Sequence, residues 1–371
     1  MMKNFQFNFL KNAIMYILII SVIVYCSPKQ KNNLLNDKEL LGKLIFFDEN
    51  LSEPKGQSCS TCHTPEKGFA DKDMRMVSEG AVNGLFANRN AITCAYSAYV
   101  PALTYDEETE EYIGGLFWDG RANTLEEQAK MPFTNPLEMG NTDGKMVVDK
   151  VKKAKYYPAL KKIYGDLDDP DSIFDAIADA IAAYERSVEV NPFSSKYDAF
   201  LDGKYQFTEE EMQGMELFID KGLCANCHVI TPDTQAKRVL FTDHTYDNLG
   251  IPANPDNPFY TIPQMYNPNG RDAIDLGLGE IVMSDKENGK FRVPTLRNIE
   301  FTAPYGHNGF FKTLEDIVHF YNVRDISSEF PQAEYAENVN TEEMGNLELT
   351  PEEELYIVTF LKTLSDGYIN K

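Results

Sequence analysis

The chain has 371 residues, 43% of them hydrophobic, and a formal net charge of −23 from 35 basic and 58 acidic side chains. A chain this acidic is repelled by a phosphate backbone, so nucleic acid is excluded as an expected partner. An acidic surface keeps a protein soluble and can steer a small partner that carries an opposite patch. The length exceeds that of a usual single domain, so we expect two domains.

The N-terminus has the pattern of an export signal. Lys3 and Lys11 precede an uncharged run over residues 13–25, which has the length of a signal peptide and is short for a membrane span. Cys26 follows directly, and no small-x-small cleavage site precedes it. Residues 1–26 therefore resemble a lipoprotein signal with Cys26 as the lipidated first residue. Tyr25 departs from the usual small residue, so an uncleaved membrane tether is the alternative. We expect a periplasmic protein, lipid-anchored to a membrane.

Two copies of the pattern Cys-x-x-Cys-His lie far apart in the chain. This pattern attaches a c-type haem through two thioethers and supplies an axial histidine. A zinc site would need a second ligand pair nearby, and a redox dithiol needs no following histidine. The sequence therefore predicts two covalently bound haem c groups, attached at Cys59, Cys62 and His63, and at Cys224, Cys227 and His228.

Each haem motif follows a predicted helix. Asn36 and Glu39 have capping-box spacing before an apolar face at residues 40–45, and Thr208 and Glu211 have the same spacing before residues 212–219. Two units of helix followed by haem predict two cytochrome c domains in tandem, residues 37–204 and 205–371.

The remaining pattern is helical with long loops. Helices are predicted over residues 125–130, 171–186, 313–321 and from Thr350 to residue 364. Segments rich in Pro, Asn and charge, residues 252–270 and 329–346, are predicted to be loops over the haem edges. No long alternating strand pattern occurs, so the predicted fold class is all-α.

Beyond these motifs, the chain resembles the bacterial diheme cytochrome c peroxidases and their MauG-like relatives. The resemblance covers nearly the whole chain after residue 41. It depends on the blocks LGKLIFF at 41–47, FWDGRA at 117–122, PLEM at 136–139, VPTLRN at 293–298 and TAPYGHNG at 302–309. In that family the N-terminal haem meets peroxide and the C-terminal haem receives electrons.

The resemblance assigns roles to several residues of the N-terminal half. Trp118, the one tryptophan of the chain, matches the residue between the two haems, where a core aromatic is the plain alternative. Glu138 matches the distal acid–base carboxylate, Gln128 a distal amide, and Pro132 a residue packed above the iron. Between His63 and the second motif the sequence has no histidine. The first haem is therefore expected to be open or water-bound opposite His63.

The sixth ligand of the second haem is less determined. The family places Met or Tyr at the position of Tyr321, and a phenolate there would lower the haem potential. The other candidates are Met283, Met344 and His319, and Tyr321 could also be a core tyrosine of an amphipathic helix.

Three further expectations concern polar residues and a cation. His307 is expected close to the haems without binding iron, and His244 is expected to face solvent. Cys94 is expected to be a small buried side chain. The resemblance also implies one Ca²⁺, held by the Asn90 side chain and the carbonyls of Thr302 and Pro304.

These features predict a diheme peroxidase that reduces hydrogen peroxide to water with electrons from a small cytochrome c or copper protein. The first alternative is a MauG-like oxidase that acts on a protein or organic substrate. The second is a diheme electron carrier without catalysis, which the open first haem and Glu138 argue against. Family members are often dimers, so a homodimer is a further expectation.

Overall fold

A computed structural model describes residues 35–368 of the chain. The chain divides into two units, residues 1–36 and 37–371, and the second unit contains every helix and strand of the described residues. The expected signal segment with Cys26 lies outside the described residues. Between residues 35 and 368, no helix is long and apolar enough to cross a membrane.

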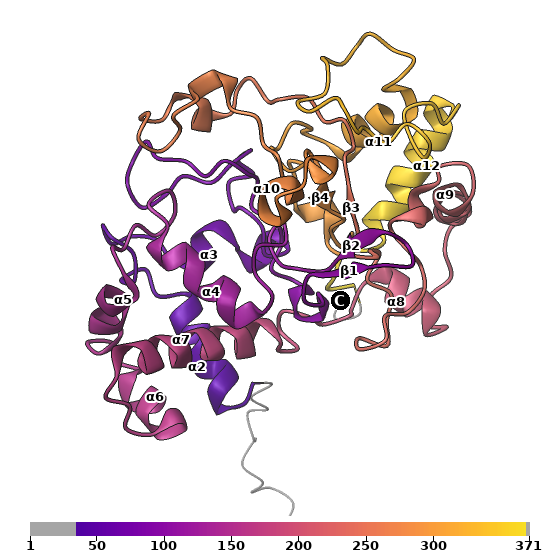
Figure 1. The fold of residues 1–371 in the computed structure, drawn as a ribbon. Helices are drawn as coiled ribbons and strands as arrows, with labels where there is room; N and C mark the ends of the chain where they lie inside the picture. The colour runs from indigo at the N-terminus through magenta and orange to yellow at the C-terminus, as the bar shows by residue number, and fades with distance from the viewer. Residues whose placement is uncertain (1–34, 369–371) are drawn as a thin grey trace, which may run out of the picture. The chain divides into compact units, whose positions relative to one another are not determined.

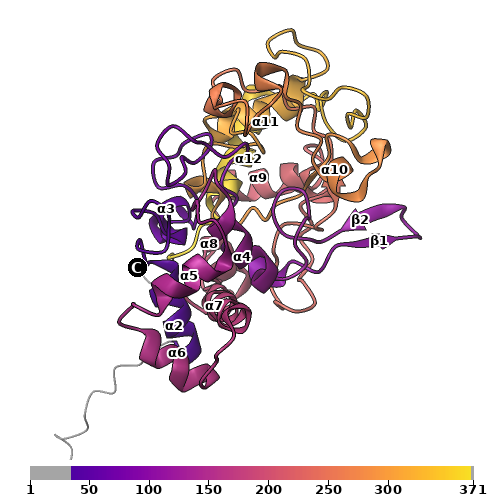
Figure 2. The ribbon, with the colours of Figure 1, turned by 60° about the vertical axis from the view of Figure 1, so that its left-hand side comes forward.

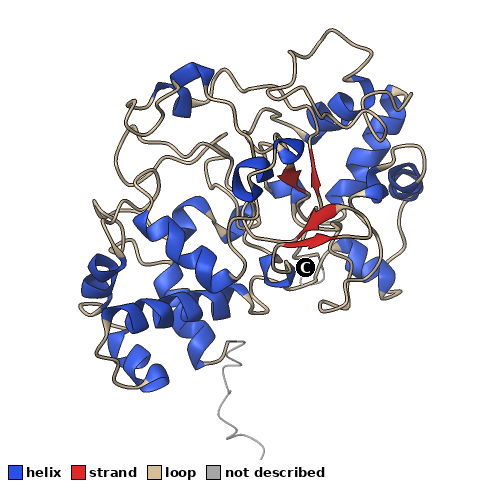
Figure 3. Ribbon diagram, in the orientation of Figure 1, coloured by secondary structure: helices blue, strands red, loops and turns tan. Residues whose placement is uncertain are grey.

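The second unit consists mainly of helices joined by long loops (Figures 1 and 3). Its α-helices are α2 (Asp37–Phe46), α3 (Cys59–Cys62), α4 (Leu125–Thr134), α5 (Gly144–Val151), α6 (Tyr157–Tyr164), α7 (Pro170–Glu185), α8 (Lys196–Leu201), α9 (Glu209–Ile219), α10 (Leu278–Val282), α11 (Leu314–Val323) and α12 (Pro351–Lys362). The strands are β1 (Thr104–Asp106), β2 (Glu111–Ile113), β3 (Tyr246–Asp247) and β4 (Phe291–Arg292).

The all-α expectation holds only in part, because these four strands form two antiparallel pairs. In β1–β2, Tyr105 lies opposite Tyr112, and this hairpin extends away from the helices (Figure 2). In β3–β4, Tyr246 lies opposite Arg292. Strands of two or three residues are too short for an alternating pattern to be visible in the sequence.

The first group of helices packs around α7, which contacts α2, α4 and α5 (Figure 1). The apolar face of α7 is fully buried, with Ile173, Ile177 and Ile181 each at most 1% exposed. Gly42 of α2 lies against the carbonyl of Ala180, where any Cβ would collide with the backbone of α7. A glycine at this crossing therefore allows the two helices to approach closely.

The second group, α9, α11 and α12, has the same kind of close crossing. Gly214 of α9 lies against the carbonyl of Tyr356 in α12, again without room for a Cβ. Side chains of α9, α11 and α12 form one buried apolar cluster, to which Tyr197 of α8 also belongs. The predicted capping box at Thr208 is present, and so is that at Thr350.

All six helices predicted from the sequence occur, with ends shifted by a few residues. Helices α3, α5, α6, α8 and α10 were not expected. Each of the five has at most eight residues, and so short a segment shows little periodicity. The N-caps Asp143 of α5 and Ser195 of α8 are the local signals that could have identified these two helices.

Candidate functional site: two cavities joined by a tryptophan

The first Cys-x-x-Cys-His motif forms α3 and places His63 at its C-terminal end. Nδ1 of His63 lies 3.1 Å from the carbonyl oxygen of Phe69. Donation from Nδ1 to this carbonyl fixes the ring and leaves Nε2 free as a ligand atom. Burial lowers the pKa of His63, which favours the neutral imidazole that metal binding requires.

A cavity of about 150 Å³ adjoins this motif. Cys59, Cys62 and His63 form part of its wall, and so do four residues that the family resemblance selected: Trp118, Gln128, Pro132 and Glu138. The structure therefore brings these four residues to the first motif, although 55 to 75 residues separate them from it in the sequence.

Helix α4 orients two of these side chains. Its N-cap, Thr124, accepts a hydrogen bond from the backbone N–H of Glu127 at 3.1 Å. Gln128 and Pro132 are four residues apart on α4, so they share one helical face, and both line the first cavity.

Glu138 follows the end of α4 and faces the same cavity. Its carboxylate accepts a hydrogen bond of 2.9 Å from Nδ2 of Asn135. Desolvation raises the pKa of Glu138, and the charge of Arg121 and the Asn135 hydrogen bond partly oppose this rise. A carboxyl group with a raised pKa can take up and release a proton nearer neutral pH.

The second motif has the same construction at its histidine. Nδ1 of His228 lies 2.9 Å from the carbonyl oxygen of Phe241, and burial lowers the pKa of His228 to about 4. A cavity of about 180 Å³ adjoins Cys224, Cys227 and His228. Both motifs thus hold a neutral histidine, oriented by a backbone carbonyl, against a cavity.

The structure separates the candidates for a sixth ligand at the second cavity. Tyr321 of α11 and Met344 both line this cavity. Met283 is 92% exposed, and Nδ1 of His319 lies 3.0 Å from the Glu354 carboxylate. Neither Met283 nor His319 lines the cavity, so both are excluded as ligands in this geometry. Burial raises the pKa of Tyr321 well above its usual range.

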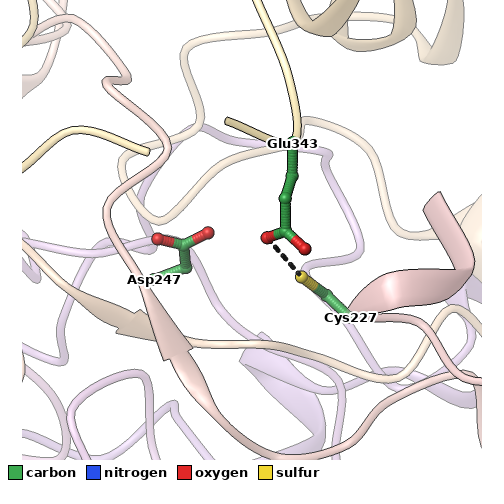
Figure 4. Close-up of side chains that lie close together, drawn as sticks. All are labelled: Cys227, Asp247 and Glu343. Atoms are coloured by element: carbon green, nitrogen blue, oxygen red, sulfur yellow. Dashed lines mark hydrogen bonds between the residues drawn. The ribbon is translucent and has the colours of Figure 1, made fainter. Parts of the chain in front are cut away.

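Two carboxylates lie beside the sulfur of Cys227 (Figure 4). Oε2 of Glu343 is 4.0 Å from this sulfur, and Nδ2 of Asn340 donates to both Asp247 and Glu343, at 2.6 and 2.9 Å. The thiol of Cys227 represents a thioether sulfur once haem is attached, which removes it as a ligand for another metal. This acidic pair was not expected from the sequence, because Asp247 and Glu343 are far apart in the chain.

Trp118 lies between the two cavities and lines both. Its Nε1 donates to the carbonyl of Asn90 at 2.9 Å, and its own carbonyl accepts from the backbone N–H of Arg292 at 2.8 Å. Close by, Arg89 makes two bonds of 2.7 Å to the Asp275 carboxylate and also pairs with Asp119. The two hydrogen bonds of Trp118 orient its indole ring and anchor its backbone.

The three residues expected to hold Ca²⁺ lie on the wall of the second cavity: Asn90, Thr302 and Pro304. Nδ2 of Asn90 donates to the carbonyl of Met76 at 3.1 Å. Its oxygen Oδ1 accepts no hydrogen bond from the described part of the chain, so it is free to face a cation.

The structure contradicts one expectation about histidines. His244 does not face solvent, since it is 8% exposed and neither ring nitrogen has a hydrogen-bond partner in residues 35–368. Long-range packing buries it, although acidic neighbours in the sequence suggested a surface position. His307 is also buried and stacks on Phe291 at 3.7 Å. It lines the second cavity.

A buried carboxyl group at the first cavity was not expected. Glu185, the last residue of α7, is 3% exposed, and its Oε2 has no hydrogen-bond partner among the described residues. Desolvation raises the pKa of Glu185 to about 8. Cys94 also lines this cavity and is buried, as expected.

Two such cavities, each with a Cys-x-x-Cys-His motif, define a c-type diheme protein. In agreement, residues 36–206 match the family described as di-haem cytochrome c peroxidase. The chain is 36% identical to the methylamine utilization protein MauG of Paracoccus denitrificans over 88% of each chain. It is 30% identical to the cytochrome-c peroxidase IdrP1 of a Pseudomonas species, over 89% of this chain and 81% of that one.

Solved structures agree with these relatives. The diheme peroxidase BthA from Burkholderia thailandensis superposes with a TM-score of 0.76 and 32% identity, over 90% of this chain and 87% of that one. The chain belongs to the di-haem cytochrome c peroxidase family, and it is an oxidoreductase with two haem c groups. The residues present fit this cofactor, since each cavity offers two sulfurs and a histidine with a free Nε2.

Proposed function

We propose that the protein reduces hydrogen peroxide to water, with two electrons and two protons per peroxide, and that a small periplasmic cytochrome c or copper protein supplies the electrons. One observation carries this proposal: Glu138 and Gln128 line the same cavity as His63, and Trp118 lines both that cavity and the second. We further propose that residues 37–204 and 205–371 are the two haem domains.

In the first cavity, the chain would bind and orient peroxide and move its proton. Gln128 would donate a hydrogen bond to the bound oxygen. Glu138, in its ionised form, would accept a proton from the oxygen nearest His63 and deliver it to the other oxygen, which leaves as water. A haem held by Cys59, Cys62 and His63 would supply the redox chemistry of O–O cleavage.

Between the cavities, the Trp118 ring would connect the site of peroxide reduction to the site of electron entry. In the second cavity, Tyr321 is proposed as the sixth ligand, because it faces the cavity that His228 lines. A Ca²⁺ held by Asn90, Thr302 and Pro304 would stabilise the wall next to Trp118. The acidic surface would attract a donor with a basic patch, and a lipid on Cys26 would hold the enzyme at the periplasmic face of a membrane.

A second function, oxidation of a protein or organic substrate as in MauG-like enzymes, is favoured by one observation. Tyr321 lines the second cavity, and a tyrosinate ligand there would favour storage of oxidising equivalents over donor oxidation. The two functions share peroxide chemistry in the first cavity. They differ in the source of the electrons that reach the second haem, which is a small donor protein in one case and a protein or organic substrate in the other.

The test uses the intact holoprotein, fully oxidised and without prior reduction. Peroxide is added alone, and then together with a reduced small cytochrome c, while the spectra of the haems and the donor are followed. A peroxidase oxidises two donor molecules per peroxide. Rapid reaction of the oxidised protein is expected because no histidine between His63 and His228 can close the first cavity.

The outcomes separate the alternatives. A long-lived oxidised state with slow donor consumption would favour the MauG-like function. If peroxide changes neither the haem spectra nor the donor, the protein is an electron carrier and the proposal is wrong. If activity requires prior reduction, a residue other than histidine closes the first cavity.

A further inference from the structure

Arg292 has a position that the proposed reaction does not use. It lies in β4, is 4% exposed, and lines both large cavities. Its backbone N–H donates to the carbonyl of Trp118 at 2.8 Å. This cationic side chain therefore borders the same two cavities as Trp118.

The guanidinium of Arg292 has no ion-pair partner among residues 35–368. Nε donates to the carbonyl of Phe117 at 3.2 Å, and Nη1 lies 3.4 Å from that of Val293. No carboxylate of the described residues lies within ion-pairing distance, and Nη2 makes no hydrogen bond there. The nearby Asp119 is already paired with Arg89 and Arg121.

The other buried arginines of the unit are neutralised by the chain. Arg297 pairs with Asp198, at 2.9 and 3.1 Å, and Arg89 pairs with Asp275. Burying a guanidinium without an anion is costly, so such groups are normally paired. Burial indeed lowers the pKa of Arg292. An anion that occupies the cavities would supply the partner that Arg292 lacks among the described residues.

Haem c brings such an anion, because its two propionates are carboxylates on the edge opposite the thioether links. We propose that Arg292 binds propionates of both haem groups and is thereby a second link between them, beside Trp118. In the second cavity the acidic pair Asp247 and Glu343 lies at the thioether edge, next to Cys227 (Figure 4). The thioether links to Cys224 and Cys227 would hold that edge of the haem, so the propionates would lie on the opposite edge, away from this acidic pair.

A shared cation has a measurable effect on both haems. A positive charge beside a haem stabilises the reduced form, which carries one negative charge more than the oxidised form. Removal of this charge by Arg292→Gln should shift the reduction equilibrium of both haems toward the oxidised state by about tenfold or more, equal to 59 mV for a one-electron couple.

The experiment measures the two midpoint potentials of the holoprotein by spectroelectrochemical titration. Arg121→Gln is the matched variant, since Arg121 lines the first cavity alone and should shift the first haem more than the second. Arg271→Gln removes an exposed charge and should shift neither haem. If Arg292→Gln leaves both potentials unchanged, or moves only one of them, the shared link is overturned.

Arg292→Lys keeps the test decisive if the glutamine variant fails to fold. A single ammonium cannot replace a planar fork between two carboxylates, so the propionate bending bands of at least one haem should move in the resonance Raman spectrum. Unchanged bands at both haems would contradict the proposal. The inference rests on haem occupying both cavities, and a pyridine haemochrome assay of the same samples checks that condition separately.

Discussion

The two haem cavities are alike around their histidines and differ in the other residues that line them. His63 and His228 each bond a backbone carbonyl through Nδ1, at 3.1 and 2.9 Å. The first cavity then presents a carboxyl and an amide group, Glu138 and Gln128. The second presents Tyr321 and Met344. One attachment scheme would therefore serve the two proposed functions: proton transfer to a small polar reactant in the first cavity, and closure of the second iron by a protein ligand.

The largest effect is expected from a change in the first cavity, which should abolish its proposed role in proton transfer. Glu138→Gln keeps the size of the side chain but removes the proton acceptor, so kcat/KM for peroxide should fall about 10²-fold or more. Steady-state donor oxidation measures the loss. The spectrum of the second haem should be unchanged, which serves as the internal control. Turnover near that of the wild type would remove Glu138 from the mechanism.

A change in the second cavity should alter the second haem and leave the first haem unchanged. If Tyr321 binds the second iron, Tyr321→Phe should open or misligate that haem and raise its potential, by about 59 mV or more for a tenfold shift in the reduction equilibrium. Optical and EPR spectra of the oxidised protein report the change.

The first haem should keep its spectrum in Tyr321→Phe. If the second haem is unaffected, Met344 becomes the ligand to replace, because it lines the same cavity. A methionine-ligated spectrum that disappears in Met344→Leu would then favour an ordinary peroxidase over a MauG-like oxidase.

The pH dependence sharpens the role of Glu138. Because burial raises its pKa above the ordinary value of 4.5, the ionised base is lost at a higher pH than for an exposed glutamate. The value of kcat/KM for peroxide should therefore fall about tenfold per pH unit below that raised pKa. The charge of Arg121 opposes the rise in the pKa of Glu138. Arg121→Gln should therefore shift the acidic fall of kcat/KM to higher pH. An acidic fall that persists in Glu138→Gln would belong to another group.

The smallest expected effect concerns Glu185, the carboxyl group of the first cavity whose Oε2 has no hydrogen-bond partner in residues 35–368. Its pKa is about 8 in the folded protein, against 4.5 ordinarily. Between these values the folded state retains a proton that the unfolded state releases, so the free energy of unfolding should fall as pH rises through this window. Glu185→Gln should remove that loss and stabilise the protein by about 1–3 kcal/mol at pH 8, with little effect at pH 5.

Urea unfolding at the two pH values measures the difference. Glu216→Gln, which changes an exposed glutamate of α9, is the matched control and should alter neither value by more than about 0.5 kcal/mol. Equal stabilities of the wild type and Glu185→Gln at pH 8 would show that this carboxyl group is not held protonated.

Local patterns of the sequence determined the parts of this protein that depend on neighbouring residues. The haem motifs are contiguous, and the capping boxes at Thr208 and Thr350 span four residues each. Periodic apolar residues likewise predicted α7 and α12, and both helices occur. Such signals act within one or two helical turns, so no tertiary contact is needed to recognise them.

Only the tertiary structure decided which distant residues meet, because burial and pairing depend on contacts between segments far apart in the chain. It buried His244 in spite of its acidic neighbours, and it exposed Met283, which spacing alone had made a ligand candidate. It also placed Arg292 against both cavities without a carboxylate partner in the described residues. A side chain's charge is visible in the sequence, whereas its missing counter-charge becomes visible only in the fold.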